Sequence, residues 1–333
     1  MLSNDLYLMN IEKAKHRINA LYNETGSACY LSFSGGKDSM IVLSLIKDLG
    51  LNIPAVFSNT GLEMVAIIDF VKWVKENYYN NIIEVKPRMS YAQVIESGKP
   101  FRSKMKSTAI KYFQKNPTGK TARSLYDDTH TTSHKLRLAN KDFHVIHKDF
   151  DIKINDNCCE EMKKQPFKEY VLTTGALGCL TGMRAAEGGQ RQFSYDRKIR
   201  NGKNVCTDIQ KDGFIQKSPI IDWSNEMCEM YISENDIPLS RAYTVYKMKR
   251  TGCYLCPFDN DLVTRLEILH KYEPNKYKAA LYFMKDVYIA QGVKLDFDEN
   301  YMNEYNEKWL KYCEMRNQML SIWRPNCRRP KVR

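Results

Sequence analysis

The chain has 333 residues, of which 43% are hydrophobic and 27% are charged, as expected for a globular protein with a sizeable core. Its 51 Lys and Arg residues outnumber 39 Asp and Glu, and the net charge of +12 favours a polyanionic partner such as nucleic acid or a nucleotide. No apolar run approaches the ~18 residues of a membrane-spanning helix, and the first residues lack the features of a secretory signal, so no membrane association is expected. Ten cysteines are too few for a disulfide scaffold in a chain this long, so we expect a reducing, cytoplasmic setting.

The spacing of apolar residues predicts helices that alternate with short strands over the first quarter of the chain. In chain order, we expect a helix over 4–24, a strand over 28–33, a helix to about Leu49, a strand over 53–57, a helix over 63–77 and a strand over 82–85. The candidate core contacts of the helix over 63–77 are Val65, Ile68, Phe70, Val71 and Val74. Such alternation indicates an α/β fold with a doubly wound, mostly parallel sheet.

The pattern weakens over about 98–156, a polar and basic stretch that we interpret as an insertion that recognises substrate. Its pair His130 and His134 fits either one metal-binding helix face or a solvated segment. Regular structure returns with a strand over 177–180 and a helix after Trp223, and residues 261–323 are predicted to be mostly helical. We therefore expect one domain over 1–260 and a helical C-terminal region with a basic tail over 261–333.

The segment Ser34-Gly35-Gly36-Lys37-Asp38-Ser39 joins a predicted strand to a predicted helix. Its glycines allow backbone N–H groups to converge on an anion, and the helix N-terminus adds unpaired donors. Lys37 adds a positive charge, so the turn is suited to phosphate. It is not a Walker A loop, because Leu31 and Asp38 stand where that motif needs Gly and Ser or Thr. A bridging Mg²⁺ would reconcile Asp38 with a polyphosphate; the alternative is an ordinary turn in which Asp38 favours the helix dipole.

This segment resembles the PP-loop of the adenine nucleotide alpha-hydrolase superfamily, which cleaves ATP between the α and β phosphates. Within it, the chain is most similar to the phosphoadenosine-phosphosulfate (PAPS) reductase-like branch. Further matches are the segment Ser58–Glu63 and Gly182-Met183-Arg184 with Glu187, where Gly188 replaces the family's serine. The resemblance spans roughly residues 25–260.

The resemblance implies a site for ATP and Mg²⁺ at the predicted loop and strand ends. The implied nucleotide-binding residues are Ser32, Ser34, Gly35, Gly36, Lys37, Asp38, Ser39, Asn59, Thr60, Gly61, Gly182 and Arg184. Lys37, Asp38 and Arg184 are the implied catalytic residues. Arg184 would approach the anionic part of the ligand, or else form a surface salt bridge.

Four cysteines have spacings typical of a metal site: the adjacent Cys158 and Cys159, and the C-x-x-C of Cys253 and Cys256. Four thiolates can hold zinc or an iron–sulfur cluster, although adjacent cysteines fit tetrahedral zinc poorly. The pattern resembles the [4Fe–4S] signature of adenylylsulfate (APS) reductases and related sulfurtransferases. Buried thiols without a metal remain an alternative. Whether the cluster is catalytic or structural stays open, since four cysteine ligands leave no open iron.

Two departures from the reductases decide the predicted activity. The chain keeps the full ATP-type loop, and it lacks the Glu-Cys-Gly-x-His segment that carries the reductases' nucleophilic cysteine. The chain thus resembles iron–sulfur ATP-dependent sulfurtransferases of the DNA phosphorothioation type. These would adenylylate an acceptor oxygen, in DNA or tRNA for example, and replace it with sulfur from a donor such as a cysteine desulfurase.

Several points stay open at this stage. A sulfonucleotide (PAPS or APS) reductase and a nucleotide-sensing, nucleic-acid-binding module are the alternative functions. Cys327, in the basic tail, is either a persulfide carrier or an incidental thiol. A homodimer is compatible with the sequence.

Overall fold

A computed structural model describes residues 4–127 and 136–323. The chain forms two compact units, each of which is made of two segments of the chain. Unit 1 comprises Met1–Pro87 and Lys163–Thr251, and unit 2 comprises Arg88–Met162 and Gly252–Arg333. The stretch interpreted as an insertion therefore falls in unit 2. The predicted domain boundary at residue 260 stays a prediction, as does the homodimer. His130, His134 and Cys327 lie outside the described residues.

Unit 1 contains a six-stranded sheet with the strand order β3-β2-β1-β4-β6-β5. All neighbouring strands are parallel except β5 and β6, which are antiparallel. In the register, Leu31 of β1 pairs with Ala55 of β2 and Leu180 of β4, and all three are fully or almost fully buried. The strands are β1 (Cys29–Phe33), β2 (Ala55–Ser58), β3 (Ile82–Val85), β4 (Gly178–Thr181), β5 (Thr207–Ile209) and β6 (Ile215–Lys217).

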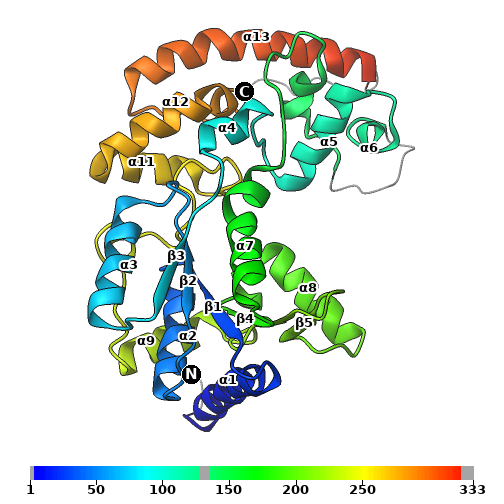
Figure 1. Cartoon of the computed structure of the whole chain (residues 1–333). Coiled ribbons are helices and arrows are strands. Elements are labelled where there is room, and N and C mark those ends of the chain that lie inside the picture. The colour runs from blue at the N-terminus through cyan, green and yellow to red at the C-terminus, as the bar shows by residue number, and fades with distance from the viewer. Residues whose placement is uncertain (1–3, 128–135, 324–333) are drawn as a thin grey trace. The chain divides into compact units, whose positions relative to one another are not determined.

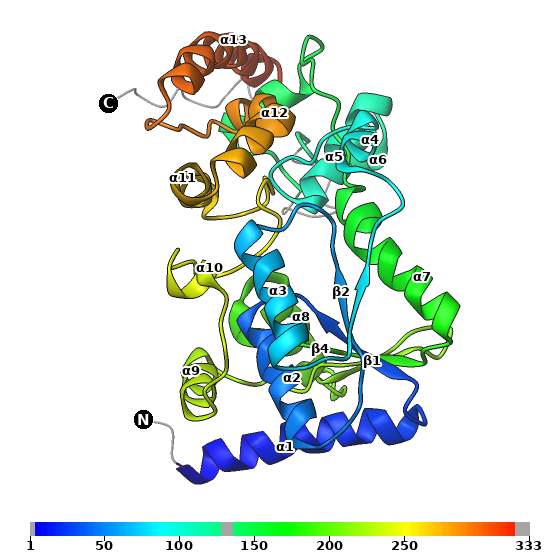
Figure 2. The same ribbon diagram turned by 60° about the vertical axis from the view of Figure 1, so that its left-hand side comes forward.

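Helices cover both faces of this sheet, so the predicted doubly wound α/β fold is confirmed. Figure 2 shows α3 and α7 on opposite sides of the strands. Helix α2 is the most deeply placed, with eight consecutive buried residues from Ser39 to Ile46. The helices of unit 1 are α1 (Asn4–Glu24), α2 (Lys37–Asp48), α3 (Val65–Asn77), α7 (Gln165–Thr174), α8 (Gly189–Arg200), α9 (Asn225–Glu234) and α10 (Arg241–Thr244), with the 3-10 helix η3 (Ala185–Glu187).

The elements predicted for the first 85 residues are all present, with ends that differ by at most two residues. One predicted core contact is wrong: Val65 is the first residue of α3 and is 42% exposed. The residues that pack inward from this turn are Ala66 and Ile67, which are 1% and 2% exposed. The hairpin of β5 and β6 was not predicted, because each of its strands has only three residues and neither is apolar throughout.

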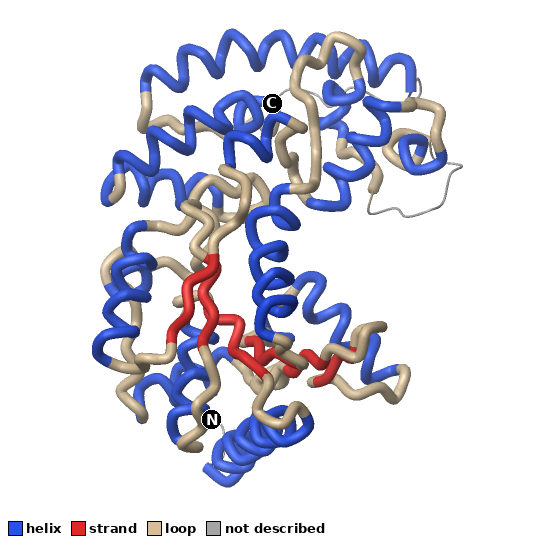
Figure 3. The backbone as a smooth tube through the Cα atoms, in the orientation of Figure 1, coloured by secondary structure: helices blue, strands red, loops and turns tan. Residues whose placement is uncertain are grey.

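Unit 2 is built from helices and loops; Figure 3 shows all described strands gathered in unit 1. Helix α13 (Glu299–Trp323) packs on α12 (Pro274–Ala290) and on the 3-10 helix η1 (Asn140–Ile146). The remaining helices are α4 (Tyr91–Glu96), α5 (Lys104–Lys115), α6 (Lys120–Arg123) and α11 (Leu262–Tyr272), and a π-helix, η2 (Glu160–Lys164), runs across the boundary between the units. The prediction of a mostly helical segment over 261–323 is confirmed. None of the described helices is long and apolar enough to cross a membrane.

Candidate functional site

The predicted phosphate-binding loop connects β1 to α2 at the carboxyl end of β1. Gly35 has a positive φ of 68°, and a Cβ atom there would lie 2.9 Å from Cγ2 of Val71 in α3. Glycine is therefore required by both the backbone conformation and the neighbouring helix. Gly36 is the N-cap of α2 and makes no side-chain cap hydrogen bond, so the first N–H groups of the helix are not capped by that residue. Such a helix N-terminus is suited to bind an anion.

Two N–H groups of this loop donate hydrogen bonds to hydroxyl oxygens. The Gly36 N–H donates to Ser34 Oγ at 3.3 Å, and the Lys37 N–H donates to Tyr243 Oη at 3.3 Å. Ser39 Oγ donates to the Gly36 carbonyl at 2.8 Å, which closes the turn. The Tyr243 hydroxyl also lies 3.2 Å from Thr251 Oγ1. The N–H groups of Gly36 and Lys37 thus point toward oxygen acceptors, and phosphate binding at this loop stays a prediction.

Asp38 forms an ion pair with Arg184, and the distance from Arg184 Nε to Asp38 Oδ1 is 2.8 Å. The Arg184 side chain is only 2% exposed, and its Nη1 donates to the Trp223 carbonyl at 3.2 Å and to Asn225 Oδ1 at 3.1 Å. Burial raises the pKa of the Asp38 carboxyl, against the opposing effect of the Arg184 charge. Arg184 thus lies against the base of the loop rather than forming a surface salt bridge, and its predicted contact with a ligand's anion stays a prediction.

Gly182 allows the end of β4 to approach the start of α2. A Cβ atom on Gly182 would lie 2.8 Å from the carbonyl carbon of Asp38 and 2.8 Å from the nitrogen of Ser39. Backbone atoms cannot yield at that distance, so the Gly-x-Arg segment needs glycine at its first position. This contact places Arg184 within reach of Asp38.

The segment after β2 is folded around the carboxylate of Glu63. That carboxylate accepts hydrogen bonds from the Thr60 N–H at 3.0 Å and from Thr60 Oγ1 at 2.8 Å. Asn59 is held to β3, because its N–H donates to the Val85 carbonyl at 2.8 Å. Asn59 Oδ1 in turn accepts from the Gly61 N–H at 3.2 Å. This loop is therefore fixed at the carboxyl end of β2.

The predicted nucleotide-binding residues come from three adjacent parallel strands and the loops that follow them. Strand β1 pairs with both β2 and β4, so the loops after these strands share the carboxyl edge of the sheet, where α/β folds bind ligands. Ser32, within β1, lies behind the phosphate-binding loop. Sequence reasoning missed Tyr243, Thr251 and Asn225, which follow no recognised motif and reach the site only through tertiary packing.

The four candidate cluster ligands all belong to unit 2, and each is half-buried. Three of these cysteines interact electrostatically with the buried side chain of Tyr91. Burial raises the pKa of the Tyr91 hydroxyl, and the charges of Cys158, Cys253 and Cys256 raise it further. The Cys256 N–H donates to the Cys253 carbonyl at 3.2 Å, so the C-x-x-C forms a tight turn. Among the described residues, however, no three His, Cys, Asp or Glu side chains form a group that could hold a metal. Four thiolates suit an iron–sulfur cluster by their chemistry, but in this structure their side chains do not lie close enough together to form one set of ligands.

Two tyrosines fix the surroundings of these cysteines. Tyr288 is completely buried, and its hydroxyl donates to the carbonyl of Leu255, inside the C-x-x-C, at 2.9 Å. The Tyr91 hydroxyl donates to Sδ of Met284 in α12 at 3.1 Å. The first contact ties the C-x-x-C to α12, and the second ties α4 to α12. The C-x-x-C turn is thus part of the packed core of unit 2 rather than a loose surface loop.

The model of the phosphoadenosine phosphosulfate reductase domain matches residues 28–132 and 120–258, which together make up more than half of the chain. The chain belongs to the PAPS reductase family. This match includes the loop Ser34–Ser39, the segment Gly182–Arg184 and all four candidate cluster cysteines. It confirms the predicted resemblance and supports an enzyme of this family.

The chain matches two longer proteins. Two uncharacterised proteins of Methanocaldococcus jannaschii are 26% and 24% identical to it over 231 and 241 residues. These matches cover 68% and 72% of the chain but 40% and 38% of the relatives. The chain therefore spans about two fifths of the length of these relatives.

Two solved structures show a distant likeness to this PAPS reductase family member. PAPS reductase from Candida auris, in a phosphate complex, matches with 14% identity and a TM-score of 0.44, over 77% of the chain and 98% of the reductase. The U34-tRNA thiolase NcsA from Methanococcus maripaludis, with its [4Fe–4S] cluster, matches with 12% identity and a TM-score of 0.37, over 86% of the chain and 82% of the thiolase. Likenesses this distant do not assign a ligand or a reaction.

Proposed function

We propose that the protein is an ATP-dependent sulfurtransferase that adenylylates an acceptor oxygen and then replaces that oxygen with sulfur. The observation that supports this best is the loop Ser34–Ser39, with its glycine-dependent turn at the N-terminus of α2. A sulfonucleotide carries its activated group when it arrives, whereas ATP needs a loop that can hold a triphosphate. Membership of the PAPS reductase family supports the use of an adenine nucleotide.

In the first step, the acceptor oxygen attacks the α-phosphorus of ATP, the bond from that phosphorus to the bridging oxygen breaks, and pyrophosphate leaves. Lys37 and the N-terminal N–H groups of α2 would stabilise the negative charge that develops on the phosphates, which is usually the largest catalytic contribution. Arg184 would hold Asp38 in place, as their 2.8 Å ion pair suggests. Asp38 would supply a carboxylate oxygen to Mg²⁺, a cation that binds carboxylate and phosphate oxygens together.

In the second step, sulfur displaces AMP from the adenylylated acceptor. A sulfide donor does this without redox change, because the new bond to sulfur forms as the bond to the AMP oxygen breaks. A persulfide donor, such as one formed by a cysteine desulfurase, leaves a disulfide that a second thiol must reduce. Cys158, Cys159, Cys253 and Cys256 would hold a [4Fe–4S] cluster, which supplies sulfur binding, electron transfer or structural support when present.

Pyrophosphate release tests this proposal. The anaerobically purified protein is incubated with ATP, Mg²⁺, a sulfur donor and candidate DNA or tRNA acceptors, and mass spectrometry of the acceptor records an exchange of oxygen for sulfur. Lys37→Ala is expected to abolish pyrophosphate release, whereas Lys47→Ala, in the last turn of the same helix, should retain it. Equal activity of the two variants would refute the assignment of the loop.

A sulfonucleotide reductase is the second candidate, favoured by the family to which the chain belongs. That enzyme would release sulfite from PAPS or APS with a separate thiol as the reductant. Sulfite release without pyrophosphate release from ATP would select this function. Nucleotide binding with neither product would instead select a nucleotide-sensing module.

A further inference from the structure

Unit 2 contains a cavity of about 660 Å³, which is within the size range of ligand-binding pockets. It lies between helix α5 and the extended segment 145–155, and all of its lining residues belong to unit 2. None of them belongs to the loop of unit 1 or to the four cysteines. The proposed chemistry therefore leaves this cavity without a role.

The inner wall of the cavity is apolar. Val145, Phe150, Ile152 and Ile154 line it and are each buried, with at most 9% of their surface exposed. The half-buried ring of Phe113 completes this wall from α5. The flat π face of an aromatic group, such as a nucleobase, suits a wall of aliphatic and aromatic side chains.

Lysines surround the opening of the cavity. Lys111 and Lys115 lie four residues apart on one face of α5, and Lys148 and Lys153 lie on the opposite segment. Lys111 pairs with Asp156 at 3.2 Å, whereas the other three lysines are exposed and form no ion pair within the described part of the chain. Asp151 is the one carboxylate among the described lining residues, so the lining has an excess of positive charge.

Hydrogen bonds connect the two sides of this cavity. Gln114 of α5 bridges to the opposite segment, since its Nε2 donates to the Ile152 carbonyl at 2.8 Å and its Oε1 accepts from the Ile154 N–H at 2.9 Å. The backbone of Lys99 pairs with this segment on both sides, at 2.8 Å and 3.0 Å. The backbone that carries the apolar wall is therefore fixed relative to α5, which limits the entropy cost of binding.

We propose that this cavity binds an unpaired nucleotide within a nucleic-acid strand, with its base against the apolar wall and the flanking phosphates on Lys115, Lys148 and Lys153. A strand fits better than a free nucleotide, because a free nucleotide carries its phosphates at one end, whereas these lysines come from both sides of the cavity. The proposal rests on the proposed function only in naming that strand as the sulfur acceptor. Binding to the cavity can be measured without ATP.

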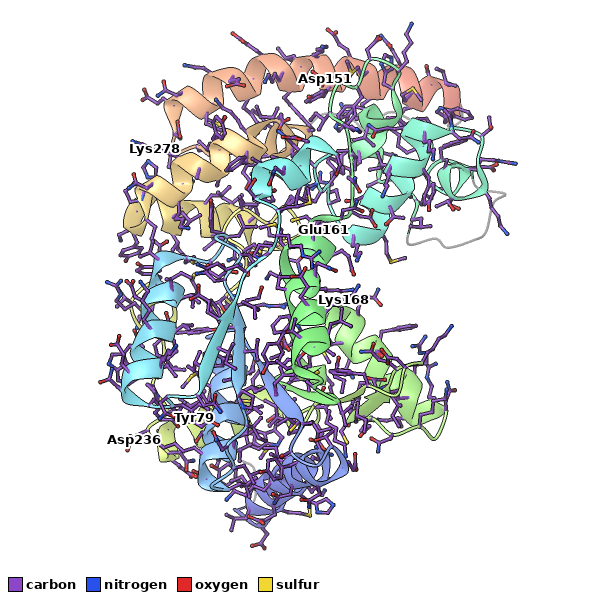
Figure 4. All side chains as sticks on the ribbon, in the orientation of Figure 1. Tyr79, Asp151, Glu161, Lys168, Asp236 and Lys278 are labelled. Carbon is purple, nitrogen blue, oxygen red and sulfur yellow. The ribbon has the colours of Figure 1, made fainter. Side chains whose placement is uncertain are left out.

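Fluorescence anisotropy with labelled single strands of DNA and of RNA, each about 20 nucleotides long, tests this site on the full chain. The triple variant Lys115→Glu, Lys148→Glu, Lys153→Glu is compared with the triple variant Lys271→Glu, Lys278→Glu, Lys294→Glu. The control lysines are exposed, belong to the same unit and change the net charge equally. Figure 4 shows Lys278 on α12, away from Asp151 of the cavity lining.

We expect the cavity variant to bind at least about tenfold more weakly and to lower the slope of log affinity against log salt by about 2. The control should lose less than about threefold. An equal loss in both variants, or no loss in either, would overturn the proposal. A preference for either DNA or RNA supports it and identifies the class of acceptor.

Two further ligands test separately whether binding requires the bases and whether it requires a strand. An abasic strand of the same length should bind about tenfold more weakly, since stacking contributes ~1–3 kcal/mol per base; equal binding would identify a general polyanion surface and overturn the proposal. A mononucleotide that displaces the strand at equal concentration would also overturn it. Normal strand binding without acceptor-dependent pyrophosphate release would reject the proposed function and leave this binding site standing.

Discussion

The hydroxyl oxygen of Tyr243 lies 3.3 Å from the backbone nitrogen of Lys37 and accepts its hydrogen bond. This N–H is at the start of α2, where a bound phosphate would need it. A phosphate oxygen bound there would therefore compete with Tyr243 for the same donor. Thr251 supports this arrangement, because its Oγ1 lies 3.2 Å from the Tyr243 hydroxyl.

We predict that Tyr243→Phe raises the affinity for a non-hydrolysable ATP analogue. The variant keeps the ring but removes the competing acceptor, and a hydrogen bond of about 1 kcal/mol corresponds to roughly fivefold in affinity. Isothermal titration calorimetry measures the change, and Tyr79→Phe, whose hydroxyl bonds the Ile53 carbonyl instead, is the control. A lower affinity in Tyr243→Phe would mean that the hydroxyl contacts the nucleotide directly.

The ion pair of Asp38 with Arg184 predicts a large stability effect. Asp38→Asn leaves the charge of the buried Arg184 without its carboxylate partner, and we expect a loss of about 3 kcal/mol in the free energy of unfolding. Asp69→Asn is the matched control, because Asp69 pairs with Arg241 where both side chains are more than half exposed. It should cost less than about 1 kcal/mol in urea unfolding. Similar losses in the two variants would show that the burial of Arg184 adds nothing.

Gly182→Ala should disturb the predicted nucleotide loop, because it pushes β4 against the start of α2. The added methyl group would meet the backbone of Asp38 and Ser39 at 2.8 Å, so β4 and α2 must move apart. We expect at least about a tenfold loss of affinity for the ATP analogue, because misplacement of about 1 Å has effects of that size or more. Gly26→Ala is the control: its φ of 56° means that this variant also strains the backbone, but a Cβ there meets nothing within 4 Å, and the residue precedes β1, at the opposite end of that strand from the loop. Unchanged affinity in Gly182→Ala would contradict the close approach.

The buried ring of His144 should make the stability of unit 2 depend on pH. Its ring is fully buried among Phe150, Trp309 and Tyr312, and burial lowers its pKa from 6.5 to about 4. Between these two values the unfolded chain binds the proton and the folded chain does not, so stability falls as the pH falls from about 6.5 to about 4. This loss amounts to about 3 kcal/mol, since one pKa unit corresponds to about 1.4 kcal/mol.

His144→Phe should remove that part of the pH dependence, because phenylalanine keeps an aromatic ring in the same place without a titrating group. Urea unfolding at several pH values, for the wild type and the variant, measures the difference. Parallel pH profiles for the two proteins would show that His144 is charged in the folded state or contributes nothing.

If the four candidate cysteines of unit 2 hold a [4Fe–4S] cluster, the protein should be coloured and contain iron. The anaerobically reconstituted protein should be brown, with broad visible absorption, and Cys253→Ser should lose most of its iron. Cys313→Ser is the control, because Cys313 is also half-buried in unit 2 but lies in α13, outside the C-x-x-C and the adjacent pair. A colourless wild type that holds stoichiometric zinc would reject the cluster, and equal iron loss in both variants would reject the assigned ligands.

The sequence by itself determined the local structure of unit 1 and the position of its loop. Apolar periodicity indicated α1 and α2, a short apolar run indicated β3, and the glycines and Lys37 marked the predicted phosphate-binding turn, because these signals act within a few residues of the chain. Weaker local signals failed: Val65 was placed in the core although it begins α3 in solvent. The residues of the basic cavity were recognised only as a polar stretch, since their shared lining depends on how α5 meets the segment 145–155.

Only the tertiary structure decided which distant residues meet. The contacts of Tyr243 with Lys37 and of Arg184 with Asp38 join segments more than 140 residues apart, and no local pattern encodes them. The same holds for Tyr91, which lies within electrostatic reach of Cys158, Cys253 and Cys256. Sequence periodicity reports which face of an element is apolar, whereas pairing of buried charges and hydroxyls depends on how the elements pack, and that is decided by the whole chain.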